Sequence, residues 1–283
     1  MKEKIVYLNG KLIPSSQAKI SAFDRGFLYG FGLFETMRAV NGHIFLLGWH
    51  LERLLEAAKE LDIGSGLDAA VLEKACQDTL AAGGLKDARL RLTVSAGEDA
   101  ASPAVLITAE EYTPPAKYHS GFHARLVATP RPATPLLGYK TTSYLANILA
   151  RSQAQAAGFD EAIFINGGGF IAEGSVSNIF AVTADGRLLT PPLSSGLLPG
   201  ITRRLVLELA IETGISAAEM EMKPAELEQA SEAFLTNSLI GIMPLTVLAD
   251  ASGNAKKIGT GKPGEQTRRL IVAYGERYKK EAL

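Results

Sequence analysis

A proline-rich stretch in the middle of the chain, residues 112–137, most limits what this sequence can fold into. Proline removes a backbone donor and interrupts both helices and central strands. Five of the 13 prolines fall in the stretch, at Pro114, Pro115, Pro130, Pro132 and Pro135. A chain of 283 residues is also long for one domain. We therefore expect two domains, residues 1–117 and 132–283, joined by a linker over residues 118–131 in which residues 123–128 can form a short strand.

The composition excludes several classes of function. The 29 Lys and Arg residues balance 30 Asp and Glu, and a net charge of −1 offers no field that would draw in nucleic acid or an anionic membrane. No run of about 18 apolar residues is present, and the first residues lack the apolar segment of a signal peptide. The single cysteine, Cys76, excludes an internal disulfide. The four histidines show no spacing typical of a metal site, so we expect a cytoplasmic protein without metal.

Hydrophobic periodicity predicts a mixture of strands and helices in the first part of the chain. The dipeptide Asn9-Gly10 is a hairpin signal, because both turn positions tolerate positive φ. Strict alternation around residue 90 places Arg89 and Arg91 on one face of a strand and leucines on the other. The predicted elements are a hairpin over residues 4–13, helices over 48–61 and 68–82, and strands over 88–95 and 104–109.

The second part predicts short strands with helices between them and no regular strand–helix–strand repeat. That order favours an α+β domain with a mostly antiparallel sheet. The predicted elements are helices over residues 142–158, 201–213 and 266–280, strand pairs within 161–172 and 178–190, and a strand over 233–236.

Several polar residues stand where chemistry could occur. Lys140 precedes an apolar helix, and a lysine in a cavity can form a Schiff base with a carbonyl. Glu173 lies among small and apolar residues and could hold a protonated ring nitrogen. The loop and helix start at residues 197–202 could hold a phosphate, and Arg89 and Arg91 suit a substrate carboxylate. Each also has a plainer interpretation: a solvated lysine, an exposed hairpin acid, an ordinary Pro-Gly turn and a solvated sheet face.

Taken together, these segments resemble the class IV, or fold-type IV, pyridoxal-phosphate aminotransferases. That family includes branched-chain and D-amino acid aminotransferases and aminodeoxychorismate lyases. The resemblance covers nearly the whole chain, from Tyr7 to Pro244. The motifs that carry it are Asp24-Arg25-Gly26, Phe34-Glu35, His50-Leu51-Glu52-Arg53-Leu54, Lys140, Glu173-Gly174 with Asn178, Leu198-Pro199-Gly200-Ile201-Thr202-Arg203, and Thr236-Asn237-Ser238.

The resemblance implies a fold, a cofactor and roles for named residues. It implies an α+β fold of two domains, a small N-terminal α/β sandwich and a larger C-terminal pseudo-barrel. It further implies pyridoxal 5'-phosphate as cofactor, with a Schiff base on Lys140, and a homodimer in which each active site is shared. The carboxylate of Glu173 would pair with the pyridine N–H. The other implied cofactor contacts are Arg53, Tyr144, Asn178, Ile201, Thr202 and Ser238, and the implied substrate contacts are Tyr29, Phe34, Thr36, Arg89 and Arg91.

Two activities fit this resemblance, and they stay open. An aminotransferase moves an amino group from an amino acid to a 2-oxo acid. An aminodeoxychorismate lyase of the folate pathway releases 4-aminobenzoate and pyruvate. Thr36 favours the lyase, whereas the turn at residues 97–102 has no arginine for a second substrate carboxylate and favours the aminotransferase. We place the aminotransferase first; a non-catalytic protein that binds pyridoxal phosphate is the remote third hypothesis.

Overall fold

The computed structural model describes residues 3–64, 66–99, 102–132 and 134–281, and its chain forms two compact units. Unit 1 consists of Met1–Pro114, Tyr139–Tyr144 and Lys280–Leu283, and unit 2 of Pro115–Gly138 and Leu145–Lys279. The segment expected as a linker, 118–131, contains strand β7 (Phe122–Leu126) of the unit 2 sheet. Because the chain returns to unit 1 after Gly138, the short segment that carries Lys140 belongs to unit 1.

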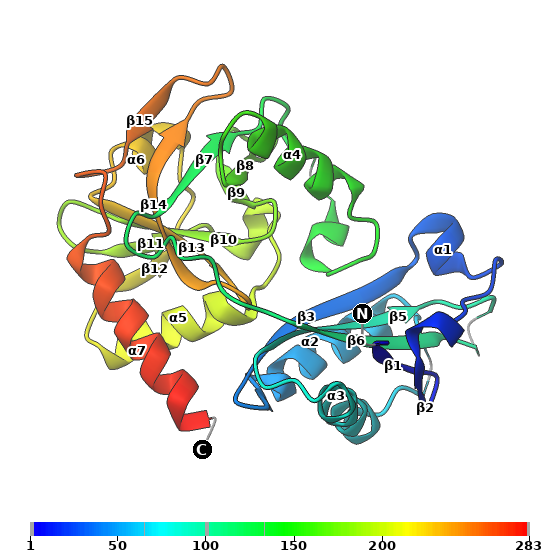
Figure 1. The fold of residues 1–283 in the computed structure, drawn as a ribbon. Coiled ribbons are helices and arrows are strands. Elements are labelled where there is room, and N and C mark those ends of the chain that lie inside the picture. The colour runs from blue at the N-terminus through cyan, green and yellow to red at the C-terminus, as the bar shows by residue number, and fades with distance from the viewer. Residues whose placement is uncertain (1–2, 65, 100–101, 133, 282–283) are drawn as a thin grey trace. The chain divides into compact units, whose positions relative to one another are not determined.

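Unit 1 is built on a six-stranded antiparallel sheet with two helices on one face (Figure 1). The helices are α2 (Leu47–Glu60) and α3 (Ala69–Gly83), close to their predicted ranges. A short helix, α1 (Arg25–Tyr29), precedes the sheet's long strand, and Asp24 caps it by accepting from the backbone of Gly26 and Phe27. In sheet order the strands are β2 (Lys11–Pro14), β1 (Ile5–Leu8), β6 (Ala104–Glu111), β5 (Ala88–Ser95), β3 (Gly32–Val40) and β4 (His43–Ile44).

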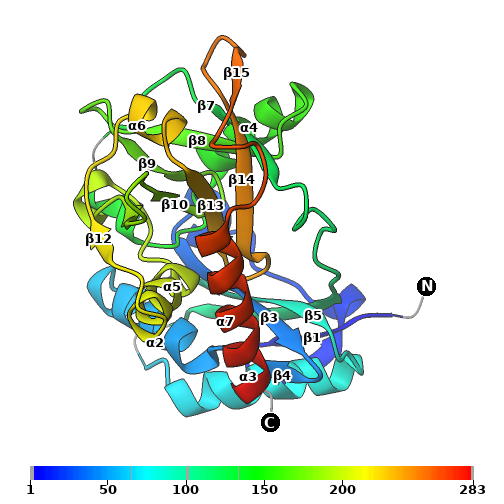
Figure 2. The ribbon, with the colours of Figure 1, turned by 90° about the vertical axis from the view of Figure 1, so that its left-hand side faces the viewer.

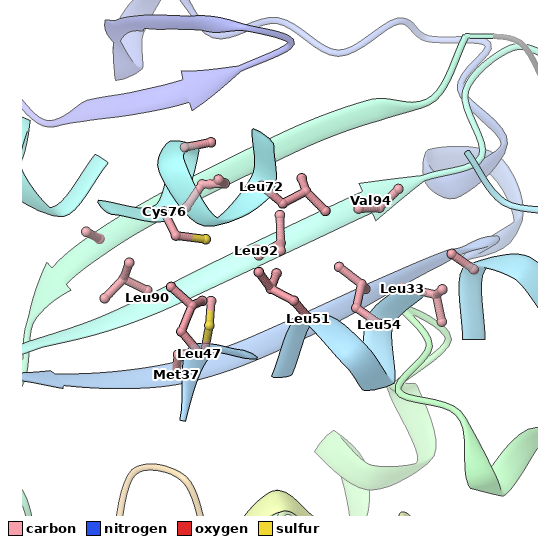
Figure 3. Packing of buried hydrophobic residues seen from close by; sticks show 14 of the residues in the cluster. Leu33, Met37, Leu47, Leu51, Leu54, Leu72, Cys76, Leu90, Leu92 and Val94 are labelled. Carbon is pink, nitrogen blue, oxygen red and sulfur yellow. The ribbon is translucent and has the colours of Figure 1, made fainter. Parts of the chain in front are cut away.

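The predicted alternation of β5 decides which face of this sheet is buried. Leu90, Leu92 and Val94 are fully buried against α2 and α3, together with Met37 of β3 and Cys76 of α3 (Figure 3). Burial raises the pKa of the Cys76 thiol to about 12, and the nearby Glu73 charge adds to the effect. Cys76 is therefore a core residue, and the opposite face of the sheet carries the polar side chains.

The segment that carries Lys140 extends the edge of β3. Its backbone pairs with the start of β3 through a bridge between Leu33 and Thr141. The hydroxyls of Thr142 and Ser143 donate to the carbonyl of Gly30, at 2.7 and 3.1 Å. The predicted helix start at residue 142 is therefore wrong, because these two residues are held by unit 1, and α4 (Leu145–Ala156) begins three residues later.

Unit 2 is a mixed nine-stranded sheet that curls into a half-barrel, in agreement with the expected pseudo-barrel. Most neighbouring strands are antiparallel as predicted, but β7 is parallel to both β14 and β8, and β11 is parallel to β12. In sheet order the strands are β12 (Ala217–Glu219), β11 (Leu188–Thr190), β10 (Asn178–Val182), β13 (Glu232–Asn237), β14 (Gly241–Ala249), β7, β8 (Glu161–Ile165) and β9 (Ile171–Gly174), with β15 (Ala255–Lys257) on β14.

Helices pack on the unit 2 sheet, and α4, for example, contacts β8. The predicted helices α5 (Ile201–Glu212) and α7 (Glu265–Glu281) lie side by side (Figure 2), joined by ion pairs such as Arg277 to Glu212. Pro224 begins the short helix α6 (Pro224–Glu228) at the position where proline is favoured. Within the described ranges, none of the helices is long and apolar enough to cross a bilayer.

Candidate functional site

In unit 1 a lysine and an arginine lie against the same aromatic ring, that of Phe34 in β3. The Nζ atom of Lys140 lies 4.5 Å from the centre of this ring. The guanidinium carbon of Arg91 in β5 lies 3.8 Å from it, and the ring of Tyr144 meets it edge to face at 5.3 Å. These residues form the Phe34 cluster. An amine beside a guanidinium is suited to a ligand that carries both a carbonyl carbon and an anionic group.

Backbone pairing with β3 positions Lys140 in this cluster. The amide N–H of Phe34 donates to the carbonyl of Lys140 at 2.9 Å, and the amide of Thr142 donates to Gly32 at 2.8 Å. Gly32 leaves little space here, because an added Cβ would lie 2.9 Å from the carbonyl of Val94 and 3.1 Å from Thr142. The sequence thus places the amine of Lys140 on a paired backbone and not on a free loop.

The polar face of the unit 1 sheet brings three of the predicted substrate residues together. Thr36 lies directly opposite Arg91 in the register of β3 and β5, so the two share this face with Phe34. Burial lowers the pKa of Arg91, and the neighbouring charge of Arg89 lowers it further. Arg89 lies on the same face, where it pairs with Glu110 at 3.5 Å, which confirms the predicted alternation of β5.

Tyr29 does not join this cluster. It ends α1 with 74% of its surface exposed, and the described residues of unit 1 give its side chain no hydrogen bond or ring contact. Tyr29 is therefore not part of the Phe34 cluster, and the residues of the cluster do not position its side chain.

A buried charge network lies on the other face of β3, where Glu35 meets two residues of α2. Arg53 donates to Glu35 from Nε at 2.9 Å and from Nη2 at 2.6 Å. The Nδ1 atom of His50 lies 2.7 Å from the same carboxylate. Burial alone would raise the pKa of Glu35, but Arg53 and His50 outweigh it and hold that pKa at about 2. Burial lowers the pKa of His50, against the opposing effect of Glu35, so its ring is neutral at pH 7.

This network predicts that acid weakens the folded state. The pKa of Glu35 is lowered on folding, so its contribution is complete above about pH 4.5 and is lost as the pH falls toward 2. The full contribution is about 3 kcal/mol at the neutral end. Neutral His50 acts in the same direction, because protons bind the unfolded chain more readily below about pH 6.5.

Urea unfolding measured from about pH 7 to about pH 3 tests this prediction. We expect the free energy of unfolding to fall across that range. In the variant Glu35→Gln we expect a lower value at neutral pH and a shallower fall below about pH 4.5. A variant that loses as much stability in acid as the parent would show that Glu35 is not the group responsible.

In unit 2 the carboxylate of Glu173, near the end of β9, accepts hydrogen bonds from three groups. Arg131 donates from Nη1 to Oε1 at 2.7 Å, and the guanidinium of Arg131 stacks 3.7 Å from the ring centre of Phe164. The backbone N–H of Leu198 donates to Oε2 at 3.0 Å, and the side-chain amide of Asn178 donates to it at 3.3 Å. An arginine partner and N–H donors are the arrangement that stabilises a carboxylate in a buried place.

The same asparagine ties Glu173 to the start of α5. Its amide also donates to the carbonyl of Leu198 at 2.9 Å. Gly200 is the N-cap of α5, and no described side chain caps this helix. A Cβ on Gly200 would lie only 1.9 Å from Oδ1 of Asn178, so glycine is required there. The first amides of α5, at the buried residues Ile201 and Thr202, therefore form a helix start that can take an anion.

Buried donors that lack a partner show that the residues of unit 2 fit a ligand rich in acceptor atoms. Thr236 lies opposite Asn178 in the pairing of β13 with β10 and is 1% exposed. Its hydroxyl has no hydrogen-bond partner among the described residues, and neither has Nη2 of Arg131. Buried polar atoms are normally bonded, so an uncapped helix start with an unbonded hydroxyl fits a phosphate. The predicted residue Ser238 follows β13 directly.

Three residues of these groups escaped the sequence analysis. Arg131 lies between two prolines of the stretch expected to be a linker, and nothing in the local pattern distinguishes it from a solvated arginine. Glu35 and His50 stand in the resembling motifs but received no role. A signal did exist for Glu35, because it occupies an inward position of β3 between the buried Leu33 and Met37.

Comparisons with known proteins match most of the chain. The family model described as amino-transferase class IV matches residues 32–248. A putative branched-chain-amino-acid aminotransferase of Methanocaldococcus jannaschii is 36% identical over 95% of this chain and 97% of its own. The aminodeoxychorismate lyase of Bacillus subtilis is 32% identical over 97% of this chain and 95% of its own. A solved branched-chain amino acid aminotransferase from T.th., with pyridoxamine 5'-phosphate, has a TM-score of 0.88 at 27% identity, covering 98% of this chain and 94% of that one.

Proposed function

Since the chain belongs to the class IV aminotransferase family, we propose that it moves an amino group from an amino acid to a 2-oxo acid with Lys140 as the reacting amine. It is an enzyme of a family that depends on pyridoxal phosphate. That cofactor, when bound, supplies an aldehyde carbon that takes up the amino group and a ring that withdraws electrons from the bond that breaks. The Phe34 cluster carries the proposal, because it holds an amine and a carboxylate-binding guanidinium against one ring.

The resemblance to the family assigns a task to each of the named residues. With the cofactor bound, Nζ of Lys140 would hold its aldehyde carbon and would carry the proton of the substrate's Cα. Glu173, held by Arg131 and Asn178, would keep a proton on the ring nitrogen of the bound cofactor. The phosphate is assigned to Arg53, Ser238 and the amides of Ile201 and Thr202, and Tyr144 to the neighbourhood of the ring.

The polar face of the unit 1 sheet supports an amino acid with an apolar side chain as donor. Arg91 offers a half-buried guanidinium to the substrate carboxylate. Phe34 and Tyr144 form an apolar wall beside it, and the relatives named above as branched-chain enzymes carry the same implication. Arg89 and Tyr29 are assigned to the outer part of the substrate site.

The lyase activity remains a second candidate because of one residue. Thr36 presents a hydroxyl on the substrate face, directly opposite Arg91. A hydroxyl at this place can donate a proton or a hydrogen bond to a departing group. The 32% identity to the lyase of Bacillus subtilis extends over nearly the whole chain and supports the same alternative.

A panel of substrates separates the two activities. Purified enzyme is given L- and D-amino acids with 2-oxoglutarate or pyruvate, and in parallel aminodeoxychorismate made enzymatically. We expect the oxo acid of an apolar amino donor to accumulate together with the amino acid formed from the acceptor. If only 4-aminobenzoate and pyruvate appear, the lyase is the activity and the aminotransferase proposal fails.

We further propose a homodimer with shared active sites. Apolar side chains are exposed on two helices, Phe27 and Tyr29 of α1 and, at helical spacing, Leu145, Ile148 and Leu149 of α4. Light scattering gives the mass directly. Tyr29→Ala is expected to lower activity. Mixing it with inactive Lys140→Ala protein should raise the rate if sites are shared, and should not raise it if each subunit is self-contained.

The cytoplasm is the compartment that this proposal assigns. The one cysteine, Cys76, is a buried thiol without a disulfide partner. Fractionation of cells tests the assignment, and recovery of the protein with secreted or envelope material would contradict it.

A further inference from the structure

The buried carboxylate of Glu35 has no task in the proposed chemistry, although it lies among the core residues of unit 1. It is 1% exposed and stands on the helix-covered face of β3, between the buried Leu33 and Met37. A charge in such a place is strongly unfavourable unless hydrogen bonds and an opposite charge offset it. The role of Glu35 must therefore be sought in its contacts with His50 and Arg53 of α2.

The first partner, Arg53, is held by both carboxylate oxygens of Glu35. Its Nε donates to Oε1 of Glu35 at 2.9 Å, and its Nη2 donates to Oε2 at 2.6 Å. Because the guanidinium is planar, two bonds along one edge fix its plane and the direction of its remaining N–H groups. An arginine side chain otherwise has several rotatable bonds, and its freedom is lost when it binds a ligand.

The second partner, His50, fixes the carboxylate in turn. It lies one helical turn before Arg53, so both side chains leave the same face of α2 toward β3. Its Nδ1 atom lies 2.7 Å from Oε2 of Glu35, and because a carboxylate oxygen accepts, Nδ1 is the nitrogen that donates. Oε2 then accepts from both His50 and Arg53, and the carboxylate can take only one orientation.

We propose that Glu35 and His50 are positioning residues that hold the guanidinium of Arg53 in the orientation that recognises the cofactor's phosphate. The inference rests on the proposed function, in which Arg53 binds that phosphate. Glu35 is negative, so its electrostatic field alone opposes a second anion near Arg53. The presence of Glu35 is explained if the orientation of Arg53 affects phosphate binding more than the negative field of Glu35 does. If orientation dominates, removing the charge of Glu35 weakens phosphate binding; if the field dominates, removing it strengthens phosphate binding.

The test is the affinity of the cofactor-free enzyme for pyridoxal phosphate and for pyridoxal, which has no phosphate. In Glu35→Gln we expect the Kd for pyridoxal phosphate to rise about tenfold, a size typical of a lost outer partner, while the Kd for pyridoxal stays unchanged. Glu56→Gln, an exposed glutamate of the same helix, is the matched control. Tighter binding of pyridoxal phosphate by Glu35→Gln would overturn the proposal, because the field and not the orientation would then dominate.

A double-mutant cycle with Arg53→Lys shows whether Glu35 acts through Arg53. Lysine keeps the charge but cannot form the two-point contact. The variant with both substitutions should lose no more affinity for pyridoxal phosphate than Arg53→Lys alone. Additive losses would overturn the proposal, because Glu35 would then act independently of Arg53.

Variants of His50 keep the test decisive if Glu35→Gln does not fold. His50→Asn retains a side-chain N–H and should keep most of the affinity for pyridoxal phosphate. His50→Leu has no such donor, and its affinity for pyridoxal phosphate should fall about as far as that of Glu35→Gln. Equal affinity in the two His50 variants would overturn the proposal. A parent enzyme that binds no pyridoxal phosphate would instead refute the proposed function itself.

Discussion

Replacing Lys140 by alanine is expected to lower turnover by more than about 10³-fold while the fold remains intact. The amine of Lys140 is the only group of the Phe34 cluster that can both bond to an aldehyde and move a proton at pH 7. Its backbone, which pairs with β3, is unaffected by a change of side chain. The expected loss is therefore one of chemistry and not of structure.

Steady-state rates with the best amino donor measure this effect, and circular dichroism checks the fold. Lys59→Ala, an exposed lysine near the end of α2, is the matched control and should keep the parent's rate. Borohydride should trap the cofactor covalently on the parent but not on Lys140→Ala. Added methylamine should restore part of the activity, since a free base can supply the missing proton transfer. Multiple turnovers without added amine would refute the assignment of Lys140.

The fold could be predicted from the sequence where one period dominates. Strict alternation gave β5 and its polar face, and helical spacing gave α2 and α3 within about two residues. Periodicity did not predict the strands β3 and β14, each nine residues long. Strand β3 hides its period because Glu35, a charged residue, points inward and Phe34 is buried on the other face.

The strand β14 was hidden for a different reason. All but one of its residues are buried, so it shows no alternation. It also contains Pro244, which argues against a central strand because it lacks a backbone donor. In the structure Pro244 faces Phe234 of β13 in register, a detail that depends on tertiary pairing.

Some residues of the candidate site could likewise be proposed from the sequence, and others could not. Lys140, Glu173 and the start of α5 could be proposed from the sequence, because they stand in motifs that resemble those of the family. Arg131 and His50 could not, since each gains its meaning from a partner far away in sequence: Arg131 from Glu173, 42 residues on, and His50 from Glu35, 15 residues before it. Hydrophobic periodicity does not predict such contacts between residues that are distant in sequence.

Glu173→Gln is expected to lower kcat by about 10²-fold or more, with a smaller change in the KM of the amino donor. The carboxylate of Glu173 meets three donors, from Arg131, Leu198 and Asn178. A glutamine has a single acceptor oxygen, so its amide nitrogen must face one of those donors, and the charge of Arg131 loses its counter-charge. In the proposed function, the proton on the ring nitrogen would then lose the adjacent negative charge that holds it, and the cofactor's electron withdrawal would weaken.

The matched control for this prediction is Glu161→Gln, because Glu161 is also a buried glutamate but is bound by neutral donors alone. Its carboxylate accepts from the amide of Ser175 at 3.1 Å and from the hydroxyl of Ser177 at 2.9 Å. Both variants disturb a buried network, but only Glu173→Gln removes a charge assigned to the ring nitrogen. We therefore expect the absorbance spectrum of the bound cofactor, and the pH at which it changes, to shift in Glu173→Gln and to stay as in the parent in Glu161→Gln. Similar rate losses with unshifted spectra in both variants would mean that Glu173 acts through packing, and its assignment to the ring nitrogen would fail.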